Sequence, residues 1–267
     1  MSLSTILFLF LAHLGVGIAF TLVFVSREAG VKFFRFNAGL ATILLVIAFA
    51  FFFSDGSRDR SFGASSLVLV ASTAAIMLYW ATVGRVLASI RPVLIAVGVG
   101  GGVLALILQA IALSFGGFAM LALTIASFLS SAALLGGACT AMILGLWYLI
   151  LPSMQVTHLQ SIVKFHIASM IVRVVVVGAA VFVAIASWRP GAGPSFQHYI
   201  TSVAGIFFWQ RVLFGLAGPA LLSYLTWETA KIRSTQSATG ILYVDFFTVV
   251  VGELLAKYLL LATRVPV

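Results

Sequence analysis

Residues 238–262 read ATGILYVDFFTVVVGELLAKYLLLA, a mostly apolar stretch of 25 residues that carries Asp245, Glu253 and Lys257. A helix needs about 20 apolar residues to cross the hydrocarbon core of a bilayer, so this stretch is long enough to span a membrane. A charge in lipid costs roughly 3 kcal/mol or more, and it is kept where a partner, a water-filled cavity or a ligand offsets that cost. The stretch therefore predicts a membrane helix that takes part in a polar site.

The composition of the whole chain agrees with this prediction. Hydrophobic residues make up 63% of the 267 residues, charged residues only 8%, and the mean hydropathy is +1.22. These values exclude a water-soluble globular domain and indicate a polytopic membrane protein. The net charge of +9 does not indicate nucleic-acid binding, because the basic residues are scattered between apolar runs. Cys139 is the single cysteine, which excludes an intrachain disulfide, a thiolate metal cluster and a CxxCH haem attachment motif.

Polar interruptions divide the sequence into eight segments that are long enough to cross a bilayer. We expect these spans near residues 3–25, 37–53, 66–84, 93–114, 118–151, 159–187, 199–226 and 238–262. The fifth segment would allow two short spans broken at Gly136 and Gly137, but it contains no polar turn, so one long helix is favoured over a count of nine. The prediction is an all-α membrane helix bundle of about eight transmembrane helices, forming a single integral membrane domain over residues 1–267.

Loop charges predict the orientation of this bundle. With eight spans, one side receives Arg27, Lys32, Arg35, Arg85, Arg91, Lys164, Lys231 and Arg233. The other side receives Arg58, Arg60, Arg189 and Arg264. Cytoplasmic loops carry an excess of Lys and Arg, so we expect both termini on the outer, periplasmic side of a bacterial cytoplasmic (inner) membrane.

Charged residues of the last three spans are expected to meet inside the bilayer. At about 1.5 Å per residue, Arg211 reaches a depth similar to that of Asp245, and adjacent antiparallel helices would pair them. Arg173 falls near the level of Glu253, which also has Lys257 one turn further on. One interpretation is a structural ladder of ion pairs among Arg173, Glu253 and Lys257. The other is a polar site that faces a cavity for a quinone headgroup, a proton or an ion.

One tryptophan and two histidines complete the predicted site. Trp209 lies beside Arg211, where a planar ring suits cation-π packing or the wall of a flat ligand site. His13 and His166 are the only two histidines placed to serve as buried axial ligands of a haem b. Their expected depths differ by about two helical turns, which favours a proton or quinone site over haem. We expect no metal site apart from that haem pair.

Three segments carry a resemblance to a known family. They are Gly252-Glu253-Leu254-Leu255-Ala256-Lys257-Tyr258, the stretch from Arg211 to Pro219, and His13-Leu14-Gly15. These segments resemble the eight-span quinol-binding membrane anchor subunits of the DMSO reductase and polysulfide reductase superfamily. The resemblance implies that the chain binds menaquinol or ubiquinol and passes electrons to an iron-sulfur partner subunit outside the membrane.

The leading hypothesis is an integral membrane subunit of a quinone-linked electron-transfer complex, respiratory or photosynthetic. Quinone reduction takes up two protons with two electrons, so the site needs a proton-exchanging group and a basic group that polarises a carbonyl oxygen. The residues expected to bind the cofactor are His13, His166, Trp209, Arg211, Asp245 and Glu253. The expected partners are the lipid bilayer and other subunits of the complex, such as an iron-sulfur or cytochrome subunit. The chain itself would supply at most a quinone site to an oxidoreductase.

Three alternative functions use the same residues. The buried charges would serve a proton- or ion-coupled transporter, or hold together a structural scaffold subunit, and the histidines would serve a b-type cytochrome. The sequence contains no phosphate-binding loop, HExxH motif or nucleophile elbow, so no soluble-enzyme class competes with these functions.

Overall fold

The computed structural model describes residues 2–54, 63–85, 89–114, 117–150, 156–188, 195–232 and 234–267. Every regular element in those ranges is helical. Eight helices in this part of the chain are long and apolar enough to cross a membrane, which confirms the all-α bundle and the expected number of spans. The loop residues Arg58, Arg60, Arg189 and Arg233 lie outside the described residues.

Seven of the eight spans are formed by one helix each. They are α1 (Leu3–Thr21), α2 (Gly30–Ser54), α3 (Gly63–Thr82), α4 (Arg91–Leu113), α5 (Phe118–Ile150), α6 (Val156–Ala186) and α10 (Thr235–Thr263). Helix α5 continues through Gly136 and Gly137, so the fifth apolar segment is one span. In an apolar medium every backbone N–H and C=O needs an internal partner, and the helix provides one even where the residues are glycines.

Helix α2 begins earlier than the apolar pattern indicates. The sequence predicted a span over residues 37–53, whereas the helix starts at Gly30 and includes Lys32 and Arg35. It follows a short helical turn, η1 (Arg27–Ala29). Long basic side chains near the end of a membrane helix keep their charge in the interface, so the helix extends beyond its apolar part.

The seventh span is assembled from several pieces. They are η3 (Val203–Gly205), α8 (Ile206–Val212), the π-helical turn η4 (Leu213–Ala217) and α9 (Gly218–Lys231), preceded by the short α7 (Phe196–Thr201). The π turn lies just before Pro219, which has no N–H to donate and whose ring would collide with the carbonyl of residue 215 in a regular α-helix. The wider turn relieves that collision, and π turns are frequent at functional sites.

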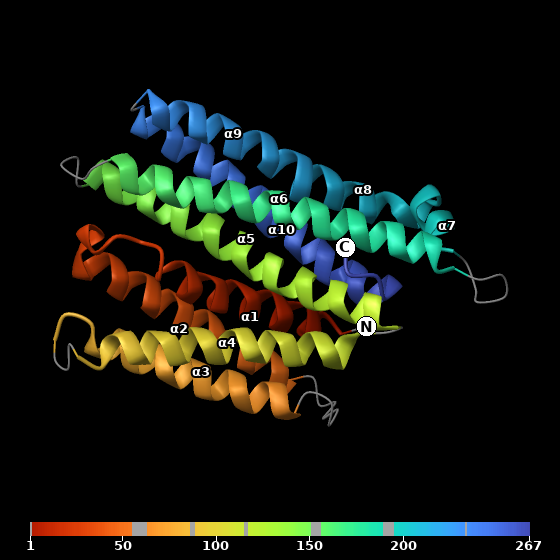
Figure 1. Cartoon of the computed structure of the whole chain (residues 1–267), viewed down its shortest axis with the longest axis horizontal. Coiled ribbons are helices and arrows are strands. Elements are labelled where there is room, and N and C mark those ends of the chain that lie inside the picture. Colours follow the sequence, from red (N-terminus) through yellow and green to blue (C-terminus); the bar gives the residue numbers. More distant parts are fainter. Residues whose placement is uncertain are drawn as a thin grey trace.

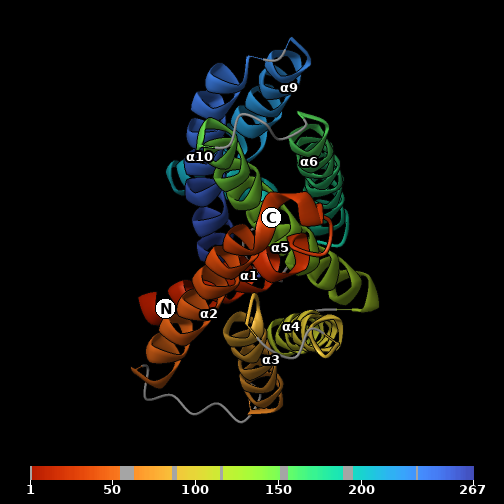
Figure 2. The ribbon, with the colours of Figure 1, turned by 90° about the vertical axis from the view of Figure 1, so that its left-hand side faces the viewer.

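Helices α1 and α5 lie in the middle of the bundle. Figure 2 shows α3 and α4 on one side of them and α6, α9 and α10 on the other. Gly17 of α1 meets Gly136 of α5 so closely that a Cβ atom on either residue would collide with the backbone of the other helix. Gly215 of η4 and Gly252 of α10 make the same kind of contact. This second contact brings η4 and α10 together where the charged side chains meet.

Both chain termini lie toward the same end of the bundle (Figure 1). An even number of spans requires this arrangement. Which side of the membrane that end faces stays a prediction from the loop charges.

Candidate functional site

Four charged side chains from α6, α8 and α10 meet inside the bundle, and we call them the ion cluster. Arg173 of α6 donates two hydrogen bonds to the Glu253 carboxylate, from Nε to Oε1 (3.0 Å) and from Nη2 to Oε2 (3.1 Å). Arg211 of α8 donates from Nη2 to Oε1 of the same carboxylate (2.9 Å). The Nζ atom of Lys257 lies 4.0 Å from Oε2. The predicted Arg173 to Glu253 pairing is therefore confirmed, and it has the bidentate geometry of a strong ion pair.

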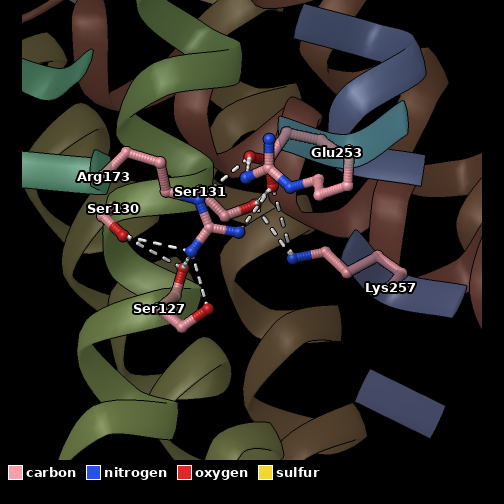
Figure 3. Close-up of polar contacts among 7 residues, drawn as sticks. Ser127, Ser130, Ser131, Arg173, Glu253 and Lys257 are labelled. Atoms are coloured by element: carbon pink, nitrogen blue, oxygen red, sulfur yellow. Dashed lines mark hydrogen bonds and ion pairs between the residues drawn. The ribbon is translucent and has the colours of Figure 1, made fainter. Parts of the chain in front are cut away.

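The remaining donors of Arg173 are bound by α5 (Figure 3). Its Nη1 atom donates to the backbone carbonyl of Ser127 (3.0 Å) and to the hydroxyl of the same residue (2.6 Å). The Ser130 hydroxyl lies 3.5 Å from this nitrogen. The whole guanidinium of Arg173 is thus held between two helices.

Ser131 of α5 joins the other two members of the ion cluster. Its hydroxyl donates to Glu253 Oε2 (2.5 Å) and accepts from Lys257 Nζ (2.8 Å). Sequence reasoning did not identify the serines of α5 as members of the site. The signal was their spacing, because positions 127, 130 and 131 share one face of a helix in an otherwise apolar stretch.

The ion cluster is closed off from its surroundings. The side chains of Arg173, Arg211 and Glu253 are 0% exposed, and that of Lys257 is 2% exposed. Buried charges are costly unless they are paired and hydrogen-bonded, and Arg173 meets that condition. Arg211 does not, because its Nε and Nη1 atoms have no hydrogen-bond partner. Its guanidinium lies against Gly215, where a Cβ atom would collide with Nη1.

A second buried contact joins α6 to α10. His166 Nε2 lies 2.7 Å from Asp245 Oδ2, and both side chains are 0% exposed. This contact does not have the geometry of a hydrogen bond, so both ring nitrogens of His166 and both carboxylate oxygens of Asp245 lack a hydrogen-bond partner among the described residues. Gly137 of α5 lies beside the ring, since a Cβ atom there would be 3.4 Å from Nδ1. An imidazole in contact with a carboxylate is a pair that can exchange a proton.

The two contacts form two levels along the same pair of helices. His166 precedes Arg173 by seven residues in α6, and Asp245 precedes Glu253 by eight in α10. Because α6 and α10 cross the bundle in the same direction, the levels are about 10–12 Å apart at 1.5 Å per residue. Spacings of seven and eight keep each set on one helix face.

His13 of α1 lies beside the ion cluster. Its ring packs edge-on against Phe128, with the two ring centroids 4.7 Å apart. Lys257 Nζ lies 5.0 Å from the centroid of the same phenylalanine ring. Both ring nitrogens of His13 are buried without a hydrogen-bond partner. His166 instead contacts Asp245, so the two histidines expected as haem ligands have different neighbours in the described structure.

The expected pairing of Arg211 with Asp245 is wrong, because Arg211 binds Glu253 and Asp245 contacts His166. The depth count assumed that the seventh span covers residues 199–226, but its membrane-crossing part is Val203–Lys231. This shift of about one turn moves Arg211 along the membrane normal, away from Asp245. Arg211 lies about one helical turn before Gly215, and Gly215 contacts Gly252, which precedes Glu253 in α10. This contact places Arg211 at the level of Glu253.

The structure does not bring Trp209 into the site. Its side chain is 57% exposed on the outer surface of the bundle, and its Nε1 atom donates to the carbonyl of Ile200 (3.0 Å). Residues two apart in a helix do not face the same side, so Trp209 and the buried Arg211 point in different directions. Nearness in sequence was therefore no guide to nearness in the site.

Among the described residues, no group of three or more His, Cys, Asp or Glu side chains is placed to hold a metal ion. The site instead offers unpaired hydrogen-bond donors at Arg211 and a buried contact between the His166 imidazole and the Asp245 carboxylate. No protein-family model matches the chain, and no curated protein is significantly similar to it.

Proposed function

We propose that the chain is an integral membrane subunit of a quinone-linked electron-transfer complex, respiratory or photosynthetic, and that its two-level polar site binds the quinone or quinol. The observation that supports this proposal most is the buried His166 and Asp245 contact two helical turns from Arg211, whose Nε and Nη1 atoms have no partner. Intramembrane ionisable residues are expensive to keep, and those without full pairing are candidates for a ligand site.

The two levels match the two chemical needs of a quinone. The unpaired Nε–H and Nη1–H groups of Arg211 are suited to donate a hydrogen bond to a carbonyl oxygen of the ring and to stabilise the negative charge that develops there on reduction. The His166 and Asp245 pair is suited to exchange the protons that accompany the electrons. Glu253 holds Arg211 in place, and His13 lines the same level of the bundle.

The proposed complex contains further subunits and lies in a bacterial inner membrane. The described residues are largely membrane-spanning helices, and in the proposed complex electrons would pass to or from another polypeptide, such as an iron-sulfur or cytochrome subunit. The element order puts Arg27, Arg85 and Lys231 at the end of the bundle opposite the termini. By the positive-inside rule this end is cytoplasmic in a bacterial inner membrane.

Bound quinone in the purified protein, alone or with its native partners, tests the proposal. We expect an organic extract of the wild-type protein to contain quinone. We expect Arg211→Gln and Asp245→Asn to contain no bound quinone and to oxidise quinol more slowly. Lys231→Gln is the matched control, because Lys231 is half-exposed and pairs with Glu228 at the end of α9. Retention of quinone and of full quinol oxidation in both site variants would refute the proposal.

A second candidate is proton- or ion-coupled transport, which the interrupted seventh span favours. Transporters often bind their substrate where a membrane helix is broken, and here the π turn η4 lies against α10 next to the ion cluster. Flux into proteoliposomes that disappears in Asp245→Asn and Glu253→Gln would establish transport. A pyridine haemochrome spectrum that depends on His13 and His166 would instead establish a b-type cytochrome.

A scaffold subunit can be distinguished from a quinone-binding subunit and from a transporter by replacing both residues of an ion pair at once. If Arg173 and Glu253 only hold helices together, apolar replacement of both should preserve assembly and activity. A functional site would be inactivated by the same change.

A further inference from the structure

Helices α6 and α9 form a seam that has an apolar, lipid-facing surface. The two helices pack against each other, as Figure 2 shows. On α6 the side chains of Ile171, Val175 and Phe182 are exposed, and their spacing places them on one helix face. On α9 the side chains of Ala220 and Tyr224 are exposed one turn apart. Surfaces of this composition on membrane-spanning helices contact the acyl chains of lipids.

Lys164 carries a positive charge at one end of this surface. It lies seven residues before Ile171 in α6, so it shares the helix face of Ile171. Its Nζ atom lies 5.1 Å from the ring centroid of Trp227 in α9, within range of a cation-π interaction. One turn earlier, Gln160 of α6 donates to the carbonyl of Ala230 in α9 (3.4 Å). The two helices are therefore joined where the charge lies.

The position of Lys164 along α6 places its ammonium at the level of the lipid headgroups. The residues of α6 that follow it, 165–186, form a stretch that is about 33 Å long at 1.5 Å per residue. The hydrocarbon core of a bilayer is about 30 Å thick, so this stretch is sufficient to cross it. Lys164 directly precedes the stretch, and its long side chain can keep the ammonium outside the hydrocarbon.

The charge of Lys164 is not neutralised by the part of the chain that the structure describes. Its ammonium has only the Trp227 ring as a partner there. A second ammonium, that of Lys231, lies 5.4 Å from the centroid of the same ring, but Lys231 Nζ is 2.7 Å from Glu228 Oε1. One carboxylate therefore serves two cations, and one positive charge remains for a ligand. Lys164 is exposed, so an anion can reach its ammonium.

We propose that this end of the α6–α9 seam binds the phosphate of an anionic phospholipid. The Lys164 ammonium forms the ion pair with the phosphate, the Trp227 ring fixes the ammonium at the seam, and the acyl chains lie along the exposed face of Ile171. Basic pockets between membrane helices are typical binding sites for acidic lipid headgroups. A zwitterionic lipid fits less well, because its own ammonium is repelled by Lys164 and Lys231. The proposal does not depend on the quinone site.

Native mass spectrometry of the full-length protein in detergent micelles counts bound lipid molecules and gives a dissociation constant for each lipid. The probes are dioleoylphosphatidylglycerol, which is anionic, and dioleoylphosphatidylcholine, which has the same acyl chains and no net charge. We expect the anionic lipid to bind at least five-fold more tightly, because one basic residue near a membrane surface attracts an acidic lipid by about that factor.

Variants locate the source of this preference. Lys164→Gln removes the exposed ammonium and should lower the preference about five-fold, whereas Lys164→Arg keeps the charge and should keep the preference. Trp227→Leu removes the ring that holds the ammonium and should lower the preference as well. Lys32→Gln is the control, because it removes one exposed cation from α2, outside the seam, and should leave the preference unchanged.

Equal affinities of the wild-type protein for the two lipids would overturn the proposal. A preference that survives Lys164→Gln, or that falls equally in Lys32→Gln, would also overturn it, since the source would then lie outside the seam. Soluble glycerol 3-phosphate tests whether the acyl chains contribute. It should not displace the bound lipid at the same concentration, and displacement would show that a soluble phosphate, not a lipid, is the ligand.

Discussion

Replacing Glu253 by Gln tests the electrostatics of the ion cluster directly. The carboxylate accepts two hydrogen bonds from Arg173, one from Arg211 and one from Ser131, and Lys257 lies 4.0 Å away. Glutamine has nearly the same shape, but it removes the only negative charge that contacts these three cations in the described structure. Three buried cations then repel one another without compensation.

The expected loss of stability is large. Breaking a buried ion pair by removing one partner costs about 3–5 kcal/mol, because the remaining charge stays buried and unpaired. Glu253 has two guanidinium partners, so we expect Glu253→Gln to reach at least the lower part of that range. Adding Lys257→Met to this variant removes one unpaired cation, and it should recover a measurable part of the loss.

Reversible unfolding in mixed micelles with increasing SDS measures these differences as free energies of unfolding. The matched control is Glu228→Gln, which breaks the pair of Glu228 with Lys231, whose side chains are 44% and 47% exposed. Exposed pairs of this kind contribute about 0–1 kcal/mol. If Glu253→Gln and Glu228→Gln had equal effects, or if Lys257→Met made the first variant less stable, the charge argument would be wrong.

Three further predictions concern the packing around the site. Gly252→Ala should lower the unfolding free energy by about 1–3 kcal/mol, because the added Cβ atom collides with the backbone of η4. Gly178→Ala is the control and should cause no loss, because a Cβ atom at Gly178 meets open space. Equal effects of the two substitutions would contradict the close contact of Gly252 with η4. Thr140→Val removes the hydrogen bond of 2.6 Å to Thr21 and should lower the unfolding free energy in the same assay by about 0.6 kcal/mol, with no change expected if the two hydroxyls do not interact. Trp209→Phe should leave the quinone content of the purified protein unchanged, because this side chain faces outward; loss of quinone would place the tryptophan back in the site.

Local sequence patterns were sufficient for the spans and for one ion pair. Apolar length predicts a membrane helix because the bilayer requires each backbone polar group to be satisfied within its own segment. The pairing of Arg173 with Glu253 was predictable because both residues lie in regular helices, where depth follows directly from a count of residues. The same count failed for Arg211, whose span is irregular and begins later than the apolar pattern indicates.

The sequence by itself determined that the chain crosses the membrane in eight helices and that its charged residues lie within them. Only the tertiary structure decided which of these residues meet. The contact of His166 with Asp245, the serines of α5 around Arg173 and the outward position of Trp209 all depend on how helices rotate and slide against one another. That placement is set by close contacts such as Gly215 with Gly252, which involve residues far apart in the chain and leave no trace in hydropathy.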